Sequence, residues 1–336
     1  MTFAPSLKEL RAELDASLWS FLEERAAELS DARALIDEVA RLLRAGGKRL
    51  RPCFCYWGFR AAGGAHGNSI VKAAAALELL HTFAIVHDDI MDRAPTRRGV
   101  PTVHHLHGIG VALLAGDLAL VLADHALMTC GLDERAVTRA FAHYSRMRQE
   151  VIAGQYLDIV AAVSASVSED EARRIAVLKS GRYSVREPLL IGAALAGADE
   201  GMVAELAAFG EPLGEAFQLR DDLLGTFGEP GALGKPVDSD IREGKRNLLY
   251  AKTLARLEPA DAARFKSAWG RGSALSERDV ADLRDLVETS GARAEVEALL
   301  GDLATTALDR LGRLTIPEEA RAALGELARS AIERRS

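Results

Sequence analysis

The chain has 336 residues, of which 49% are hydrophobic and 27% are charged, a balance that excludes intrinsic disorder, collagen-like chains and small disulfide scaffolds. Lysine and arginine number 42 against 49 for aspartate and glutamate, a net charge of −7, which argues against general binding to nucleic acid or anionic membranes. Three cysteines without a CxxC pair indicate reduced thiols and a cytoplasmic location.

Two amphipathic helices are predicted near the start of the chain. Apolar residues recur there at spacings of three and four, so each helix has one hydrophobic face. The first set is Leu7, Leu10, Leu14 and Leu18, and the second is Leu35, Val39 and Leu42. No basic segment followed by an apolar run precedes them, so no signal peptide or transit peptide is expected.

The rest of the chain also predicts helices. Residues 102–187 contain no proline, and strand-like alternation of β-branched and aromatic residues is almost absent. The most apolar stretch, 111–130, contains Asp117 and Asp124, so it predicts a buried helix and no transmembrane segment. Glycine or proline marks loops at 45–48, 62–64, 94–96, 225–236, 258–259 and 270–276. The fold class expected is therefore all-α, with one large helical domain over residues 1–336.

A first acidic motif, His87-Asp88-Asp89-Ile90-Met91-Asp92, follows the mainly apolar run 77–86. A spacing of four residues puts Asp88 and Asp92 on one helix face, about 6 Å apart along the axis. Two carboxylates so placed can bind Mg²⁺ through oxygen. An isolated motif of this kind is often only a solvated helix end, but the apolar flanks favour a metal site.

A second acidic pair, Asp221-Asp222, ends another apolar helical stretch at 216–220. If the two acidic helices faced one another across a cavity, their carboxylates would raise each other's pKa unless cations lay between them. The alternative is that the two pairs are unrelated helix caps.

Basic residues cluster near the acidic motifs in an otherwise acidic protein. Arginine and lysine borne on loops in this way predict a receptor for phosphate groups. They are Lys48, Arg49 and Arg51, then Arg97 and Arg98, then Lys235, Arg242, Lys245 and Arg246.

Five segments together resemble the trans-isoprenyl diphosphate synthases, also called polyprenyl synthetases. They are GGKRLRP at 46–52, LLHTFAIVHDDIMD at 79–92, TRRGVPTVH at 96–104, GQYLD at 154–158, and 217–247. The pattern is most similar to bacterial geranylgeranyl and farnesyl diphosphate synthases. The resemblance implies a helical bundle around a central cavity, Mg²⁺ as cofactor, a homodimer, and isopentenyl and allylic diphosphates as substrates.

The resemblance also implies a role for each matched residue. Asp88, Asp89 and Asp92 would bind Mg²⁺ with the allylic diphosphate, and Asp221 and Asp222 would hold a further ion, with Asp88, Asp92 and Asp221 as the metal ligands. Isopentenyl diphosphate would be bound by Lys48, Arg51, His81 and Arg98. The allylic diphosphate would be bound by Arg97, Lys179, Gln218, Lys235 and Lys245, with Lys179 also catalytic and Ser180 at a position where the family usually has threonine.

Two positions depart from the family pattern. Gly225 stands where many relatives have a third aspartate in the second motif, which predicts a lower metal affinity or turnover. Asn247 replaces a common threonine after Lys245-Arg246.

The reaction implied is ionisation of the allylic diphosphate, attack by isopentenyl diphosphate, and loss of a proton. Phe83, five residues before Asp88, would form the floor of the product pocket, and the small Ala84 follows it, as in geranylgeranyl-type enzymes. Farnesyl or longer products stay open. So do an HD-type metal phosphohydrolase, suggested by His81 and His87-Asp88, and a non-catalytic subunit of a heteromeric synthase, suggested by Gly225.

Overall fold

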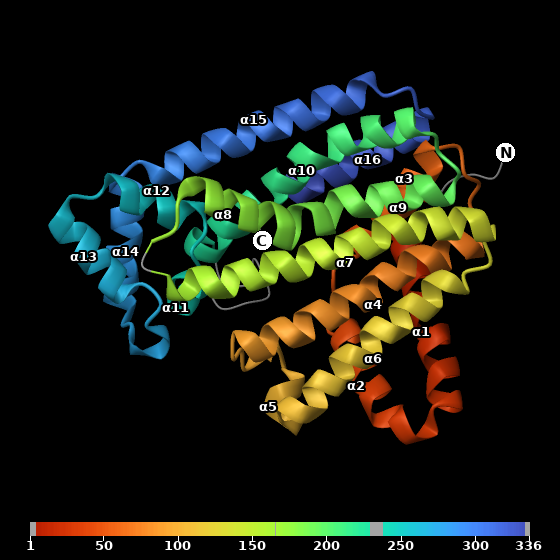
Figure 1. Ribbon diagram of the computed structural model, residues 1–336, viewed down its shortest axis with the longest axis horizontal. Coiled ribbons are helices and arrows are strands. Elements are labelled where there is room, and N and C mark those ends of the chain that lie inside the picture. The colour runs from red at the N-terminus through yellow and green to blue at the C-terminus, as the bar shows by residue number, and fades with distance from the viewer. Residues whose placement is uncertain (1–4, 165, 229–237, 333–336) are drawn as a thin grey trace. The chain divides into compact units, whose positions relative to one another are not determined.

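A computed structural model describes residues 5–164, 166–228 and 238–332. Helices make up about four fifths of this part of the chain, and its strands are the two-residue β1 (Thr96–Arg97) and β2 (Val100–Pro101), so the predicted all-α class is confirmed (Figure 1). The contacts divide the chain into two compact units, each made of three segments. Unit 1 comprises residues 1–144, 188–206 and 314–327, and unit 2 comprises 145–187, 207–313 and 328–336. The expectation of one domain and of a central cavity stays a prediction.

Unit 1 contains the N-terminal helices. They are α1 (Leu7–Glu28), η1 (Ser30–Ala32), α2 (Arg33–Arg44), α3 (Leu50–Ala61), α4 (Asn68–Met91), α5 (Val103–His107) and α6 (Ile109–Met128). The start of α7 (Glu134–Val163), most of α9 (Glu187–Leu195), the start of α10 (Glu200–Phe227) and most of α16 (Glu318–Ile332) complete it.

Both predicted amphipathic helices are present as α1 and α2. The four leucines of the first pattern are all buried in α1, and Val39 and Leu42 are buried in α2. Ser6 caps α1, since its side chain accepts from the backbone N–H of Glu9 while the Glu9 carboxylate accepts from the N–H of Ser6. Such a reciprocal cap satisfies two backbone donors that the helix itself leaves unpaired.

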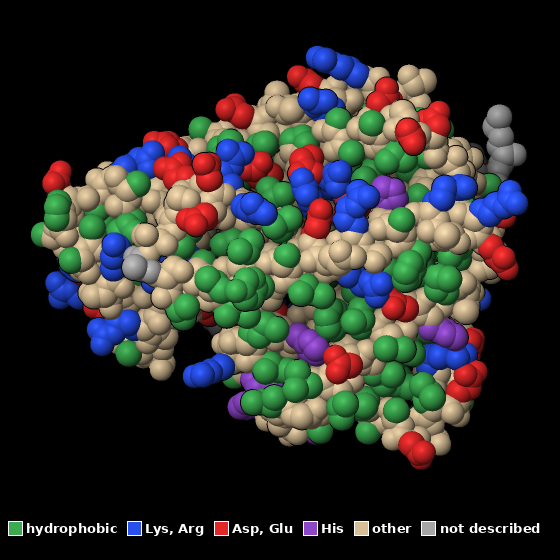
Figure 2. Space-filling view, in the orientation of Figure 1, with side chains coloured by type: hydrophobic (Ala, Val, Ile, Leu, Met, Phe, Trp, Pro, Cys, Tyr) green, Lys and Arg blue, Asp and Glu red, His purple; other side chains and the backbone are tan. Residues whose placement is uncertain are grey.

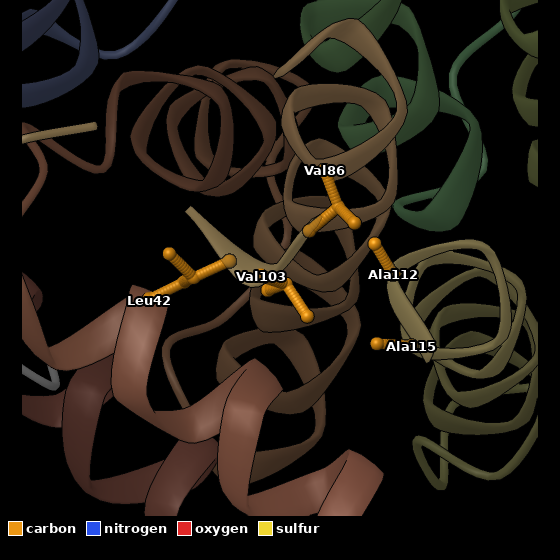
Figure 3. Packing of buried hydrophobic residues seen from close by; sticks show 5 residues of the cluster. All are labelled: Leu42, Val86, Val103, Ala112 and Ala115. Carbon is orange, nitrogen blue, oxygen red and sulfur yellow. The ribbon is translucent and has the colours of Figure 1, made fainter. Parts of the chain in front are cut away.

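Helices α4 and α6 pack side by side, and this pairing supports the first acidic motif. Figure 3 shows Val86 of α4 directed toward Ala112 and Ala115 of α6, with Leu42 and Val103 nearby. Alanine at these positions lets the two helices approach closely, because its side chain occupies little space between them. The end of α4 is therefore held by a packed core only two residues before Asp88.

Helix α6 differs from the prediction of a buried helix. Ile109, Leu113, Leu114, Val121 and Met128 are all exposed along one side of it. By length and composition alone, α4 and α6 are the two helices of the described residues that are long and apolar enough to cross a membrane. Most of α4 is covered by the rest of the structure, whereas less than half of α6 is. An exposed stripe of apolar residues of this kind is typical of a surface that binds another molecule.

Unit 2 contains the rest of α7 and α10 together with the C-terminal helices. They are α8 (Glu169–Ala176), η2 (Val177–Arg186), α11 (Ser239–Glu243), α12 (Leu248–Arg256), α13 (Pro259–Ala268), η3 (Gly272–Ala274), α14 (Glu277–Thr289) and α15 (Ala292–Arg313), with the end of α16. Pro212 lies inside α10, although proline usually breaks a helix. Leu213, Ala216 and Phe217 beyond it are buried and hold the helix in place.

Candidate active site

The first acidic motif lies at the C-terminal end of α4. Asp88 and Asp89 are in its last turn, and Asp92 caps it in a helical conformation, with its backbone N–H donating to the Asp88 carbonyl at 2.8 Å. The predicted spacing of Asp88 and Asp92 on one helix face is therefore kept. The C-terminal end of a helix carries partial negative charge, so this end of α4 favours a cation.

Arg97 on β1 is ion-paired with the first acidic motif. Its Nε donates to Asp89 Oδ1 at 2.8 Å, and its Nη2 lies 3.4 Å from Asp88 Oδ2. Burial would lower the pKa of Arg97, but the negative charges of Asp89 and Asp88 outweigh burial and raise it. The Asp89 side chain is only 1% exposed, against 18% for Asp88. Asp89 is thus the buried anchor of the motif, and Asp88 is the more accessible carboxylate.

Strands β1 and β2 form a hairpin with a two-residue turn, and this hairpin directs Arg97 and Arg98 to different partners. Arg98 and Gly99 connect β1 to β2, and both have positive φ, 54° and 78°. This is the backbone conformation of a type I′ turn, which favours glycine at its second position. The Arg98 guanidinium donates to the carbonyl of Gly46. Consecutive arginines therefore link the acidic motif to the glycine loop at 45–49.

Arg98, Arg51 and His81 form a basic cluster in unit 1, and Lys48 lies exposed in the loop that Arg98 contacts. Burial lowers the pKa of His81 well below its ordinary value, and the charges of Arg51 and Arg98 lower it further. Burial together with neighbouring arginines also lowers the pKa of Arg98. Cations that disfavour one another's charge in this way attract an anion. The four residues predicted to bind isopentenyl diphosphate are thus placed around one part of unit 1.

The sequence grouped Arg49 with the cations that were predicted to bind phosphate. In the structure, Arg49 does not share this role. Its guanidinium donates to Asp15 and to Glu78 at 2.8 Å each, and to the carbonyl of Leu43 at 2.8 Å. Its side chain is 3% exposed. A side chain on Gly47 would fall 2.8 Å from an Arg49 nitrogen and 3.2 Å from one of Arg98, so glycine lets both guanidinium groups pass the loop. Arg49 is a buried structural ion pair.

The second acidic motif lies near the end of α10 in unit 2. Asp222 is buried, and its Oδ1 accepts from Gln218 Nε2 at 2.7 Å. Burial raises the pKa of Asp222 well above its ordinary value, the charge of Asp240 raises it further, and Asp221 and Asp158 add to the effect. We call these four carboxylates the second acidic cluster. Gln218, predicted to bind the allylic diphosphate, orients Asp222 in this structure.

Two predicted lysines contact Asp158, one of the four carboxylates of this cluster. Lys179 Nζ donates to Asp158 Oδ2 at 2.6 Å, and Lys245 Nζ lies 3.6 Å from the same oxygen. Lys179 and Ser180 are in η2, where the helix widens to π geometry, a feature often found at functional sites. Both lysines are therefore placed together, while Lys235 lies outside the described residues.

The donor set of both acidic clusters fits Mg²⁺. Within the described ranges, no three His, Cys, Asp or Glu side chains are gathered as a ready-made cage for a metal ion. Mg²⁺ does not need such a cage, because it is usually bound by one or two carboxylates together with water and substrate phosphates. Burial and the neighbouring carboxylates raise the pKa of Asp222, and a divalent cation would relieve this environment.

Asp158 and Asp240 were missed as individual site residues. Both lie inside segments that carried the family resemblance, 154–158 and 217–247. Nothing in the local spacing distinguishes either from a surface carboxylate. Their shared influence on Asp222 arises only when α7, α10 and α11 pack.

Phe83 and Ala84 are half-buried on α4, one turn before the acidic motif. The ring of Phe83 meets the imidazole of His87 edge-on, with the centroids 4.8 Å apart. His87 Nε2 lies 3.2 Å from the Leu113 carbonyl oxygen and 3.7 Å from Asp117 Oδ1, both on α6. His87 thus faces α6, which disfavours the metal-ligand role that an HD-type phosphohydrolase would need.

Comparison with known proteins gives a consistent result. The family model described as polyprenyl synthetase matches residues 33–287. A farnesyl diphosphate synthase of Mycobacterium tuberculosis is 37% identical over 294 residues, covering 86% of this chain and 80% of that protein. A geranylgeranyl diphosphate synthase of Sulfolobus acidocaldarius is 39% identical over 256 residues, covering 74% of this chain and 75% of that protein.

Solved structures agree with the sequence comparison. The crystal structure of a geranylgeranyl pyrophosphate synthase from Corynebacterium glutamicum, in complex with isoprenyl diphosphate and magnesium, matches with a TM-score of 0.92 and 36% identity. The match covers 98% of this chain and all of the other.

Proposed function

The chain belongs to the polyprenyl synthetase family and is a trans-prenyltransferase, and from this premise we propose that it adds isopentenyl diphosphate to an allylic diphosphate up to geranylgeranyl diphosphate. The single observation that carries the substrate assignment is the pair Arg97 and Arg98. Arg97 is bound to the acidic motif that would take Mg²⁺, and its neighbour Arg98 belongs to the basic cluster. In this hairpin, Arg97 would therefore bind the allylic diphosphate, and Arg98 would bind isopentenyl diphosphate.

Mg²⁺ bound with the allylic diphosphate would stabilise the negative charge that develops on the leaving group. Asp88 and Asp92 of unit 1 would bind this ion, and Asp221 of unit 2 would hold a further ion. In unit 1, Arg97 is fixed by its ion pair with Asp89, and in unit 2, Lys179 and Lys245 are fixed by Asp158. Each of these cations would be a preorganised donor to diphosphate oxygens. Preorganised charge of this kind lowers a barrier without needing reorganisation during the reaction.

The basic cluster would bind the diphosphate of the acceptor substrate. His81 enters this site uncharged near neutral pH, since its pKa is lowered, and can donate one hydrogen bond to a phosphate oxygen. The double bond of isopentenyl diphosphate then attacks the allylic cation, and a proton is lost from the new chain. The released diphosphate is the proposed acceptor of that proton.

We propose that Phe83 limits the length of the product. Its ring is half-buried and is supported by His87, so it can act as a floor for the growing chain. The relatives include both farnesyl and geranylgeranyl diphosphate synthases, and farnesyl diphosphate is the second candidate. Incubation with isopentenyl diphosphate, each allylic primer and Mg²⁺, followed by sizing of the dephosphorylated products, tests the choice. A product of four isoprene units supports the proposal, and accumulation of three units supports the farnesyl alternative.

We also propose one polyprenyl synthetase domain that works in the cytoplasm as a homodimer. The family match includes residues of both units, which supports one domain. Leu114, Val121 and Met128 are exposed at seven-residue intervals on α6, and Figure 2 shows hydrophobic side chains gathered on that part of the surface. A second copy would cover this stripe. Light scattering should give twice the monomer mass for the wild type, and the monomer mass for a Leu114→Asp, Val121→Asp double variant.

A further inference from the structure

The loop 244–247, which joins α11 to α12 and carries Lys245, is held by the end of α13 in unit 2. Trp269 follows the last residue of α13 and is buried, and its indole Nε1–H donates to the Lys245 carbonyl at 3.0 Å. The backbone N–H of Lys245 donates to the Asp240 carbonyl at 2.9 Å. Both backbone polar groups of Lys245 are therefore hydrogen-bonded, and one of their partners is a buried side chain from a later part of the sequence.

Two glycines bring the end of α13 against this loop. Gly244 and Gly270 have positive φ, 78° and 88°. A Cβ atom on Gly270 would lie 3.0 Å from Gly244 Cα, and a Cβ atom on Gly244 would lie 2.9 Å from Gly270 Cα. The N–H of Gly270 also donates to the Ile241 carbonyl at 2.9 Å. Since a side chain at either glycine would force the two segments apart, their close approach brings the Trp269 indole within reach of Lys245.

An aromatic cluster fixes the indole of Trp269. The cluster consists of Tyr250, Phe265 and Trp269, which are all buried and have ring centroids 5.0 to 5.5 Å apart. Arg246, the residue after Lys245, places its guanidinium carbon 4.2 Å from the centroid of the Tyr250 ring, a favourable cation–π contact. Trp269 is thus a fixed donor, because its close-packed neighbours leave the ring little room to turn.

The side chain of Lys245 has a defined place beside the second acidic cluster. Its Nζ lies 3.6 Å from Asp158 Oδ2 and 3.7 Å from Glu243 Oε2. Lysine carries its ammonium group on a flexible stem of four carbons, so the backbone decides which positions that group can reach. A misplacement of about 1 Å in a reacting geometry can cost roughly a hundredfold in rate. Fixing the Lys245 backbone therefore limits where its ammonium group can lie.

We propose that Trp269 is a positioning residue, which holds the Lys245 backbone so that the Lys245 ammonium group meets the allylic diphosphate. The inference rests on the proposed function, in which Lys245 binds that diphosphate. Trp269 lies outside the five segments that carry the family resemblance, the last of which ends at residue 247. Its role comes from tertiary packing, and no local motif indicates it.

A first pair of variants removes an indole N–H from two different places. Trp269→Phe keeps an aromatic ring in the cluster but removes the donor to the Lys245 carbonyl. Trp57→Phe is the matched control, because the Trp57 indole N–H is buried in unit 1 and has no hydrogen-bond partner within the described residues. Both variants exchange a buried indole for a smaller ring, so both should lose some stability.

A second pair of variants shifts the turn after α13 and keeps the indole. Gly270→Ala adds a Cβ atom against Gly244 Cα. Gly272→Ala, its control, adds a Cβ atom at a positive φ of 57° with no atom of the described chain within 4 Å. Both changes put alanine in the left-handed region and strain the backbone, whereas only Gly270→Ala pushes Trp269 away from the loop.

The KM of each substrate, kcat and the melting temperature are measured for all four variants with Mg²⁺. We expect Trp269→Phe and Gly270→Ala to raise the allylic KM by about three- to tenfold, as for the loss of one hydrogen bond, and to leave the isopentenyl KM unchanged. Both controls should keep the wild-type KM values. An unchanged allylic KM in Trp269→Phe, or an equal rise for both substrates, overturns the inference. If Trp269→Phe does not fold, the same two results for Gly270→Ala against Gly272→Ala decide the question.

A double variant shows whether Trp269 acts through Lys245. Lys245→Ala alone should raise the allylic KM more than Trp269→Phe does. In the double variant Lys245→Ala, Trp269→Phe, the second change should add nothing further, because the group that Trp269 positions is absent. A further rise of about three- to tenfold would show an independent effect of Trp269 and overturn the inference. A wild-type allylic KM in Lys245→Ala contradicts the proposed function instead.

Discussion

The aromatic ring of Phe83 rests edge-on against the imidazole of His87, one helical turn later on α4, with 4.8 Å between centroids. His87 is held in turn by the Leu113 carbonyl of α6. The ring is thus supported from the side of the acidic motif although it is only half-buried. A half-buried ring held in this way is what the proposed floor of the product pocket requires, and the variant below tests whether Phe83 has that role.

Phe83→Ala should lengthen the product. Without the ring the growing chain can extend further along α4, and the loss of stability should stay below the roughly 3 to 5 kcal/mol typical of a fully buried phenylalanine. Chromatography of dephosphorylated products and a melting curve measure the two effects. Phe265→Ala is the control, because Phe265 is fully buried in unit 2; it should lose stability and keep the product length. Unchanged product from Phe83→Ala would show that Phe83 is only a packing residue.

Asp88→Asn should reduce turnover by several orders of magnitude. The reason is the loss of a carboxylate that binds Mg²⁺ on the leaving group, and each roughly 1.36 kcal/mol added to the barrier costs a factor of ten. Steady-state rates at saturating Mg²⁺ measure the effect, and EDTA should abolish the wild-type activity. Asp37→Asn serves as the control, since the Asp37 side chain is exposed and its ion pair is with Arg33, at 3.8 Å. Full activity in EDTA would contradict the metal requirement.

Arg98→Gln should raise the KM for isopentenyl diphosphate more than that for the allylic substrate. A lost hydrogen bond to a charged group costs about 1.5 to 3 kcal/mol, which corresponds to roughly ten- to a hundredfold in affinity. Arg49→Gln is the contrast, because it leaves Glu78 buried without its ion-pair partner. That variant should lose about 3 to 5 kcal/mol of folding stability. Equal weakening of both substrates by Arg98→Gln would show that the two diphosphate sites have been assigned incorrectly.

His81 should make the folded state less stable at acidic pH. Its folded pKa is lowered well below 6.5, so between that value and about 6.5 the unfolded chain binds a proton that the folded chain does not. The stabilisation is complete above about pH 6.5 and is lost as the pH falls, at no more than about 1.36 kcal/mol per pH unit. Urea unfolding against pH should give a shallower acid loss for His81→Gln than for the wild type, while the exposed His105→Gln should match the wild type. Identical slopes for His81→Gln and wild type would refute the lowered pKa.

Much of the helical architecture was predictable because the hydrophobic periodicity is local. The leucines of α1 and the acidic motif at the end of α4 follow from spacings of three and four residues. Pro212 shows the limit of such reasoning, since burial of the residues after it keeps α10 continuous. Local preference was overridden there by tertiary packing.

The sequence could indicate which residues belong to the candidate site, but it could not indicate which of them contact one another. The resemblance identified Arg97, Lys179 and Gln218, yet their partners Asp89, Asp158 and Asp222 depend on how strands and helices pack within each unit. Arg49 was grouped with the phosphate ligands because neighbours in sequence share a charge, whereas its guanidinium is buried between α1 and α4.

The most direct test of the proposed function is the ratio of diphosphate released to isopentenyl diphosphate consumed, measured with Mg²⁺ and an allylic primer. We expect one diphosphate for each isopentenyl diphosphate incorporated, no release when isopentenyl diphosphate is omitted, and a final product of four isoprene units. Release of phosphate or diphosphate that does not depend on isopentenyl diphosphate would contradict the assignment of this chain as a prenyl-chain-extending enzyme.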